Sequence, residues 1–211
     1  MAMKPETLSL KQRAYKNIFD QIMDGRFAPG TLLNRRGLAQ QLKMSAAPVH
    51  EAMIQLEQNG FLEALPRHGT RVLSVQLKDV RGHLVIREAL ECQAARMICG
   101  ERLKHNLPAL KILADAIDLG DQTDAVRARQ EVSFHVALVE LADCPALLRE
   151  YRKIMQMGLF YRINLLMSLP SRELKNRHTS LLEGLCTDSP EAAEHCMREH
   201  VCSGKPEALK S

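Results

Sequence analysis

Apolar positions in the first third of the chain recur at helical intervals between turn residues. From Ser9 to Asp24 they repeat every three or four residues, which predicts an amphipathic helix. After the turn FAPG, Asn34 and Ser45 are placed to cap two further helices, of which the second ends at Gly60. The β-prone runs FLEAL and TRVLSV flank PRHG and predict a hairpin. This order of elements predicts a winged helix-turn-helix over residues 8–75.

The rest of the chain, residues 76–205, carries longer helical patterns. Breaks such as HNLP, LGDQ, DCP, SLPS and TDSP separate six stretches, approximately 78–104, 107–119, 122–143, 145–168, 171–186 and 189–203. Helices joined by short turns pack antiparallel, so the sequence predicts a mainly α protein that ends in an antiparallel six-helix bundle. Residues 75–79 contain no Gly or Pro, which predicts a stiff connection between the two domains.

Composition narrows the class of protein. The chain has 211 residues, of which 45% are apolar and 26% charged, as in ordinary globular proteins. Aromatic residues make up 4% with no Trp, which argues against the stacking surfaces of single-strand binders. No apolar run reaches the ~20 residues that cross a bilayer, and the first residues lack a signal-peptide core. The sequence therefore predicts a cytoplasmic protein without a membrane partner, whose six cysteines are reduced thiols.

Charge is unevenly distributed. Residues 1–75 contain ten Lys and Arg against six Asp and Glu, which is the whole net charge of +4, while the remainder is balanced at nineteen of each. A basic excess on a small domain favours a polyanionic partner, although many solvated surfaces reach this value by chance.

The predicted helix-turn-helix offers contacts to duplex DNA. A helix capped by Ser45 presents free backbone amides, and its first turn can enter a major groove. Arg35 and Arg36, at the start of the preceding helix, can hold the phosphate backbone.

The predicted wing offers a second contact. Arg67 and His68 precede Gly69, and a glycine permits the close backbone approach that a minor groove demands. The alternative is that Arg35, Arg67 and Arg71 are ordinary solvated charges.

Polar residues at helical spacing suggest a metal site in the second domain. Glu131 and His135 are four apart and share a helix face, while His178 and His200 lie on the last two helices at similar heights. Such a donor set is typical of Zn, Ni or a similar divalent ion. A histidine on a helix is more often a surface or core residue, and we interpret three others in that way: His83, His105 and His195.

The first domain resembles the DNA-binding domain of GntR-type bacterial transcriptional regulators over nearly sixty residues. The resemblance covers AYKNIFDQIMDGRFAPGTLLNRRGLAQQLKMSAAPVHEAMIQLEQNGFLEALPRHGTRV. That family commonly has Arg where this chain has Ala46 and His50. Because a bidentate Arg–guanine contact is worth ~1–3 kcal/mol, the resemblance implies a redirected base readout, in which His50 can still donate one hydrogen bond.

The second domain resembles the all-helical ligand-binding domain of the FadR subfamily, and its six helices are similar to the VanR-like branch. The matching segments are IREALECQAA, EVSFHVALVELADCPAL, RHTSLLEGL and DSPEAAEHCMREHV. In metal-binding members one Asp and three His hold the ion, and these positions fall on Glu131, His135, His178 and His200. The resemblance also implies a carboxylate effector opposite Arg87, although a surface pair of Arg87 with Glu91 is the alternative.

Together these patterns predict a regulator rather than an enzyme. We expect a homodimer that reads a pseudo-palindromic duplex operator and senses a small organic acid at a Zn or Ni site. Two alternatives are a metal-dependent hydrolase or lyase and an architectural DNA binder without a sensor. H-E-x-x-H and Glu-x-x-His motifs are both absent from the sequence, which argues against the enzyme.

Overall fold

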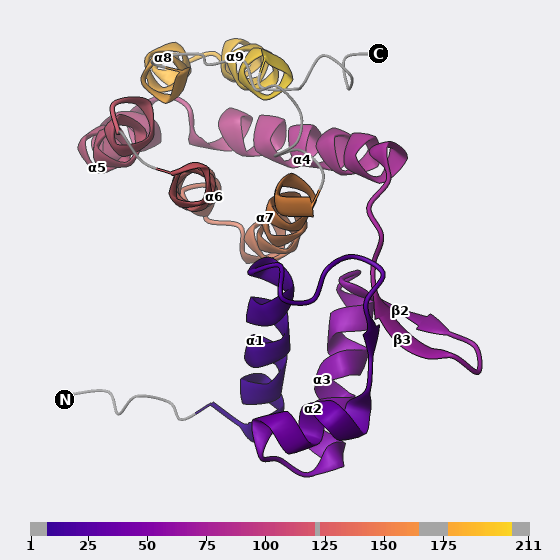
Figure 1. Ribbon diagram of the computed structural model, residues 1–211. Coiled ribbons are helices and arrows are strands. Elements are labelled where there is room, and N and C mark those ends of the chain that lie inside the picture. The colour runs from indigo at the N-terminus through magenta and orange to yellow at the C-terminus, as the bar shows by residue number, and fades with distance from the viewer. Residues whose placement is uncertain (1–7, 121–122, 165–176, 204–211) are drawn as a thin grey trace, which may run out of the picture. The chain divides into compact units, whose positions relative to one another are not determined.

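The computed structural model describes residues 8–120, 123–164 and 177–203 (Figure 1). These residues form two compact units, the first ending at Val75 and the second beginning at Gln76. Within the described ranges, no helix has the length and apolar character needed to span a membrane. The predicted helix start at residue 122, the end at 165–168 and the start at 171–176 lie outside the described residues.

The first unit is a winged helix-turn-helix, as the sequence predicts. Its elements in chain order are α1 (Leu10–Met23), β1 (Leu32–Leu33), α2 (Arg35–Leu42), α3 (Ala46–Gln58), β2 (Leu62–Leu65) and β3 (Gly69–Val72). The strands pair antiparallel in the order β1-β3-β2. Strand β1 was not predicted, because two residues are too short to show an alternating pattern.

Apolar packing between α1 and α3 holds this unit together. Ile18 and Ile22 of α1 and Val49 and Leu56 of α3 are fully buried, at the helical spacing read from the sequence. Figure 1 shows the two helices side by side, with α2 across their ends. The opposite face of α3 is left exposed.

The helix starts agree with the predicted caps except in one detail. Asn34 Oδ1 accepts hydrogen bonds from the amides of Arg36 and Gly37 at 3.0 and 3.4 Å. Ser45 occupies the N-cap position of α3, but its side chain makes no capping hydrogen bond, so that part of the prediction is wrong. A capping side chain accepts from the second or third helical amide, and the third residue of α3 is Pro48, which has no N–H.

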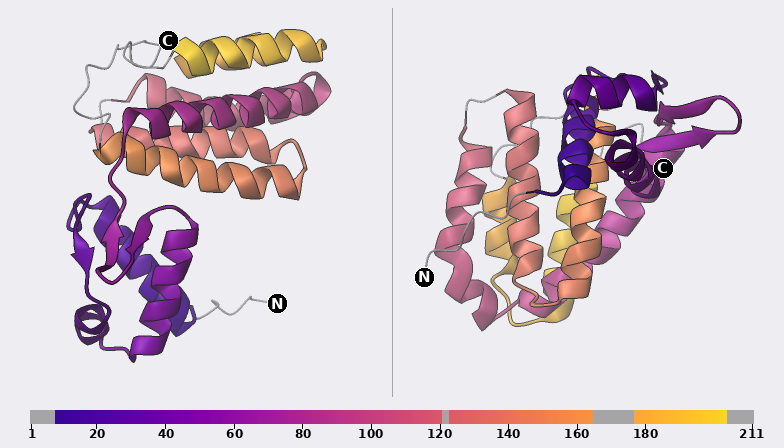
Figure 2. Two further views of the ribbon diagram at one scale, coloured as in Figure 1. Left: turned by 90° about the vertical axis from the view of Figure 1, so that its right-hand side faces the viewer. Right: turned by 90° about the horizontal axis from the view of Figure 1, so that it is seen from below.

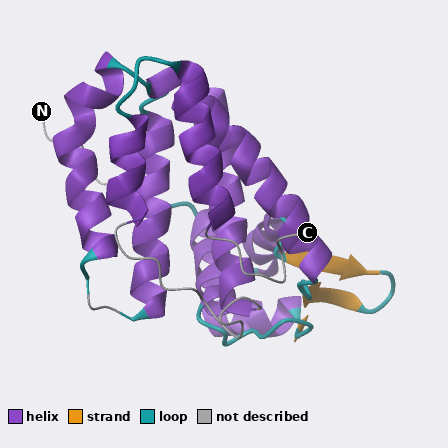
Figure 3. Cartoon of the chain, turned by 90° about the horizontal axis from the view of Figure 1, so that it is seen from above, coloured by secondary structure: helices purple, strands orange, loops and turns teal. Residues whose placement is uncertain are grey.

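The second unit is a bundle of helices. Its elements are α4 (Leu77–Ile98), α5 (Glu101–Asp118), α6 (Asp124–Glu140), α7 (Pro145–Asn164), α8 (Arg177–Leu185) and α9 (Pro190–Ser203). Helix α4 packs against α9 and α7, and α5 packs against α6 and α8. Figures 2 and 3 show helices of this unit running side by side. The predicted mainly α class is confirmed.

One predicted helix boundary is wrong. The expected helix 78–104 ends at Ile98, and α5 runs without a break through the HNLP sequence and Pro108. The chain turns at Gly100, whose φ of 77° is a left-handed conformation that glycine adopts readily. Pro108 removes only the hydrogen bond to the carbonyl of Lys104, and because Lys104 is exposed, water can bind that oxygen.

The core of the bundle surrounds several polar side chains. Its fully buried apolar residues come from all six helices and include Ile98, Leu103, Phe134, Tyr151 and Leu185. Among them lie buried histidines from α6, α8 and α9. Because a buried polar group must find a partner inside the protein, this part of the core is a candidate site.

Candidate metal centre and nucleic-acid interface

Three histidines from three helices converge inside the bundle. His135 of α6, His178 of α8 and His200 of α9 each offer a ring nitrogen, and these atoms lie within 4.8 Å of one another. The residues are only 1%, 2% and 8% exposed, respectively. His200 Nε2 lies 3.4 Å from His135 Nε2, so these two rings meet by the nitrogens that most often bind metals in such sites.

Asp118 fixes the ring of His178. The Nδ1–H of His178 donates to Asp118 Oδ1 at 2.7 Å, because an ionised carboxylate can only accept. The other ring nitrogen, His178 Nε2, is buried without a hydrogen-bond partner in the described part of the chain. A buried imidazole lone pair beside two further imidazoles matches the donor set of a divalent metal.

Asp118 also caps the start of helix α8. Its Oδ2 accepts the backbone amides of His178 and Thr179 at 3.0 and 2.9 Å. Burial alone raises the pKa of Asp118, but the Thr179 amide and the His178 ring together lower it below its usual range. The carboxylate is therefore ionised at neutral pH, and it ties the end of α5 to the first turn of α8.

A second buried carboxylate lies behind His135. Glu91 Oε2 is 3.3 Å from His135 Nδ1, without the alignment of a hydrogen bond, and Glu91 is fully buried. Arg87 Nε donates to Glu91 Oε1 at 2.7 Å, and the Tyr151 hydroxyl donates to the same oxygen. Burial raises the pKa of Glu91, but the positive charge of Arg87 and the ring of His135 lower it well below its usual range.

Burial favours the neutral forms of His178 and His200. It lowers the pKa of His178 and lowers that of His200 further, and in both cases the neighbouring His135 ring adds to the effect. Neutral imidazole is the form that binds metal ions, so these side chains are ready as ligands without first losing a proton.

Glu131, the fourth predicted ligand, lies one helical turn before His135 on α6. It is half-buried, and its carboxylate is not among the atoms that lie within 4.8 Å of one another. Its negative charge weakly opposes the lowering of the His178 pKa by burial, and it adds to the raised pKa of Arg87. The structure thus brings three of the four predicted ligands together, with Glu131 beside them.

Arg87 forms the pair with Glu91 that the sequence offered as an alternative. The pair lies inside the bundle rather than at the surface, since the two side chains are only 19% and 0% exposed. Glu91, Tyr151 and Asp118 were missing from the predicted site. No sequence pattern marks Asp118, because it meets His178 across 60 residues of chain.

The predicted DNA-contacting residues lie on one unit and are exposed. Arg35 and Arg36 open α2, and Ala46 and His50 lie on the exposed face of α3. The wing residues Arg67, His68 and Gly69 are exposed at the turn between β2 and β3.

Arg71 differs from these arginines. Its Nε donates to Glu63 Oε1 at 2.6 Å across the wing strands, so its charge is already balanced. Within the described residues, Arg35, Arg36 and Arg67 form no such ion pair with an acidic side chain. This leaves them available to bind phosphate.

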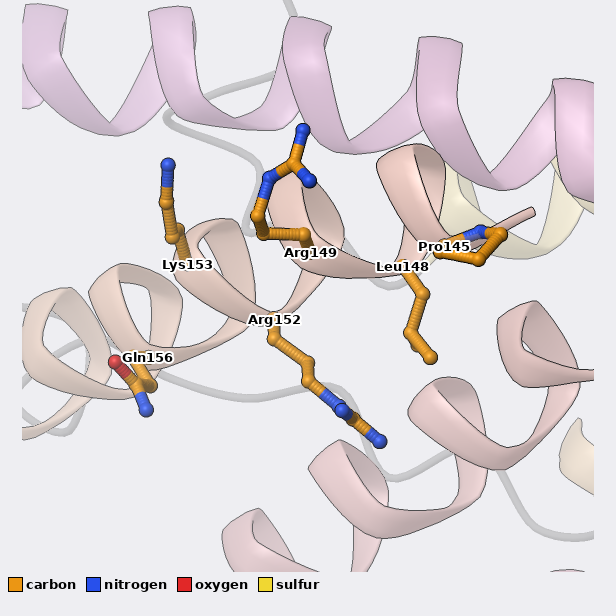
Figure 4. Close-up of a pocket in the computed structure, with 6 residues that line it drawn as sticks. All are labelled: Pro145, Leu148, Arg149, Arg152, Lys153 and Gln156. Carbon is orange, nitrogen blue, oxygen red and sulfur yellow. The ribbon is translucent and has the colours of Figure 1, made fainter.

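A shallow hollow of about 360 Å³ lies on α7 and is lined by Pro145, Leu148, Arg149, Arg152, Lys153 and Gln156 (Figure 4). Its cations already pair with Glu150 or Glu140 at 3.0–3.2 Å. None of the three clustered histidines lines this hollow, and we do not assign it to the site.

Comparison with known proteins places both units in recognised families. Residues 10–72 match the bacterial regulatory proteins of the gntR family, and residues 83–202 match the FCD domain. The chain is 30% identical over 200 residues to the probable D-xylose utilization operon transcriptional repressor of Paenarthrobacter nicotinovorans, covering 90% of this chain and 85% of that protein.

Solved structures share the fold. Escherichia coli McbR/YncC superposes with a TM-score of 0.64 and 24% identity, covering 92% of this chain and 94% of that one. A putative GntR regulator from Rhodococcus sp. RHA1 superposes with a TM-score of 0.69 and 19% identity over the same shares. At these identities the likeness shows the fold alone.

Proposed function

The chain belongs to the gntR family of bacterial regulatory proteins and carries an FCD domain, so it is a DNA-binding transcriptional regulator. We propose that its helical unit senses a small organic acid through a divalent metal ion. Because the family and the relatives are regulators, the metalloenzyme alternative is set aside.

The unpartnered Nε2 of His178 is the observation that carries the proposal. A buried nitrogen lone pair without a partner costs ~1–3 kcal/mol, and a metal ion at this point would remove that cost. His135, His178 and His200 are the proposed ligands, with Glu131 as the fourth, and Zn or Ni suits such a set.

The surrounding charges favour a cation at the cluster. Glu91 and Asp118 both lie against ligand histidines, and Arg87 balances only one of these carboxylates. A carboxylate behind a histidine holds the ring in place and strengthens it as a ligand. With the three histidines alone as ligands, a bound Zn would keep a fourth position open for one oxygen of an organic acid. With Glu131 also bound, the ion would have to take five or more ligands to bind the acid.

Arg87 is the proposed partner for the carboxylate of the effector. Its Nε donates to Glu91 and its side chain also lies against Tyr151, which together orient the guanidinium whose terminal nitrogens are proposed to bind the anion. Because α4 begins at Leu77, two residues after the first unit ends in the chain, a shift of Arg87 would move a helix that is connected to the DNA-binding unit by a short segment of backbone.

DNA binding is proposed to use two winged helices in a homodimer. One such unit covers too few base pairs for useful specificity, so two related by a dyad would read a pseudo-palindromic operator. The proposed contact residues are Arg35, Arg36, Ser45, Ala46, His50, Arg67, His68 and Gly69.

The experiment is a titration of operator DNA with metal-loaded protein in the presence and absence of small carboxylates. An acid that lowers DNA affinity tenfold must itself bind ~1.4 kcal/mol less well to the DNA complex. The Arg87→Lys variant keeps a positive charge beside the buried Glu91 and should bind DNA and metal as before. It lacks the forked guanidinium and should lose most of the response to the acid. An unaltered response in that variant would remove Arg87 from the effector site.

A further inference from the structure

The exposed face of helix α3 is unusually apolar for a helix that contacts DNA. Ala46, His50 and Ile54 are spaced four apart and are all exposed, with Ala47 beside them. The opposite face is buried in the core of the unit. No Lys or Arg occurs anywhere from Ala46 to Gln58.

The first turn of a recognition helix meets the edges of the bases in the major groove. Guanine is read there by paired donors from Arg or Lys, which this helix does not have. Thymine is the base that presents a methyl group, and it is read by apolar contact with side chains such as Ala. We propose that α3 reads thymine methyl groups through Ala46 and Ala47, an inference that rests on the proposed entry of α3 into the major groove.

Ser45, His50 and Glu51 are the polar residues nearest to the two alanines, and the Ser45 hydroxyl can either donate or accept. His50 can donate one hydrogen bond to an acceptor such as thymine O4, and Glu51 can only accept, so it adds no donor for guanine. The face therefore offers methyl groups for thymine and lacks the Arg or Lys side chain that most commonly reads guanine, while Glu51 could accept from cytosine N4.

Phosphate binding is supplied by neighbouring elements. Arg35 and Arg36 on α2 and Arg67 in the wing are exposed, whereas Arg71 is held by Glu63. Contacts to phosphates give affinity and register without sequence preference. Because α2 and the wing bind the phosphates, α3 can discriminate between DNA sequences by the shape and methyl groups of the bases.

The test has two stages. Sites are first selected from a random duplex pool with the intact protein, and the selected half-sites should contain thymines without an obligatory guanine opposite position 46. Each thymine is then replaced by deoxyuridine, which removes only the methyl group. Loss of one buried methyl should weaken binding about fourfold at one or two thymines in each half-site.

Matched variants identify the side chains responsible. Ala46→Gly and Ala47→Gly each remove one methyl group near the helix start and should abolish the uracil penalty at one thymine. Ala64→Gly, on the exposed wing strand, removes a methyl group outside α3 and should leave every penalty unchanged. In addition, Ala46→Arg should shift the selected half-site toward guanine.

The outcomes separate this inference from the proposed function. An enriched operator in which uracil is tolerated at every thymine overturns the thymine readout alone. Absence of any enriched sequence contradicts the proposed readout by α3 as well as this inference. A penalty that survives in both Ala46→Gly and Ala47→Gly shows that other residues contact the methyl groups.

Discussion

Asp118 and His178 form a contact that joins the end of helix α5 to the first turn of α8. The carboxylate accepts the Nδ1–H of the imidazole at 2.7 Å and also accepts the amide of the same residue at 3.0 Å. One side chain thus fixes both the backbone and the ring of a proposed metal ligand, with its Nε2 left for an ion. Residues that support a ligand in this way are as important to a metal site as the ligands themselves.

Replacement of Asp118 should weaken metal binding although every proposed ligand remains. For Asp118→Asn we expect a loss of ~10–100-fold in Zn affinity, because the ring is no longer held by a charged acceptor. Competition with a chromophoric chelator measures this loss. Asp188→Asn is the matched control, since Asp188 is an exposed acid whose ion pair within the described residues is with Lys104 at the surface. Equal affinities for the two variants would show that Asp118 does not position the ligand.

His83 should make the metal-free protein sensitive to acid. Burial lowers the pKa of His83 to about 4, and the charge of Arg87 adds to this effect while that of Glu91 opposes it. In the unfolded chain His83 binds a proton near pH 6.5, whereas in the folded chain it stays neutral down to about pH 4. The free energy of unfolding therefore falls by up to ~3 kcal/mol as the pH drops from about 6.5 towards 4.

Urea unfolding of the wild type and of His83→Leu across this pH range isolates the contribution of His83 to the pH dependence of stability. His178 and His200 shift in the same direction and remain in both proteins, so only the difference between them is diagnostic. The variant should lose less stability on acidification. Parallel pH profiles for the two proteins would show that the pKa of His83 is the same in the folded and the unfolded state.

Affinity for duplex DNA should fall steeply with salt. Each phosphate contact contributes about 0.9 to the slope of log K against log salt, so Arg36→Ala should reduce the slope by about one. Arg71→Ala is the matched control, because Arg71 is already paired with Glu63. Gel shifts over a salt series measure both. A slope that is the same in wild type and Arg36→Ala would exclude Arg36 as a phosphate contact.

The sequence was a sound guide wherever apolar spacing was strong. Helix α1, its end near Gly25 and the hairpin of the wing follow from residue patterns alone. Proline was a poor guide, because Pro108 lies within α5 while Gly100 makes the turn. Proline inside a helical pattern usually predicts the end of a helix, but packing along the whole of α5 outweighs the loss of one hydrogen bond.

In the candidate site too, residues at regular helical spacing were predicted, and residues that meet through packing were not. His135, His178 and His200 lie together as their helical spacing predicted. Asp118 could not be found this way, because its role depends on the packing of α5 against α8 and not on any neighbour in sequence. Arg87 was expected to face a ligand, with a surface pair to Glu91 as the alternative. The pair forms, but its burial depends on the packing of α4 against its neighbours and could not be predicted from the i,i+4 spacing.

Direct measurement of bound metal tests the central proposal. The purified protein, exposed to excess Zn or Ni and then desalted, should retain one ion per chain. Elemental analysis should find that ion lost in His178→Ala and retained in His195→Ala, whose side chain is 75% exposed, and in Arg87→Lys, which keeps a positive charge beside Glu91. Circular dichroism confirms that each variant is folded. A native protein without a divalent ion, or a His178→Ala variant that keeps it, would contradict the account of a metal-based sensor.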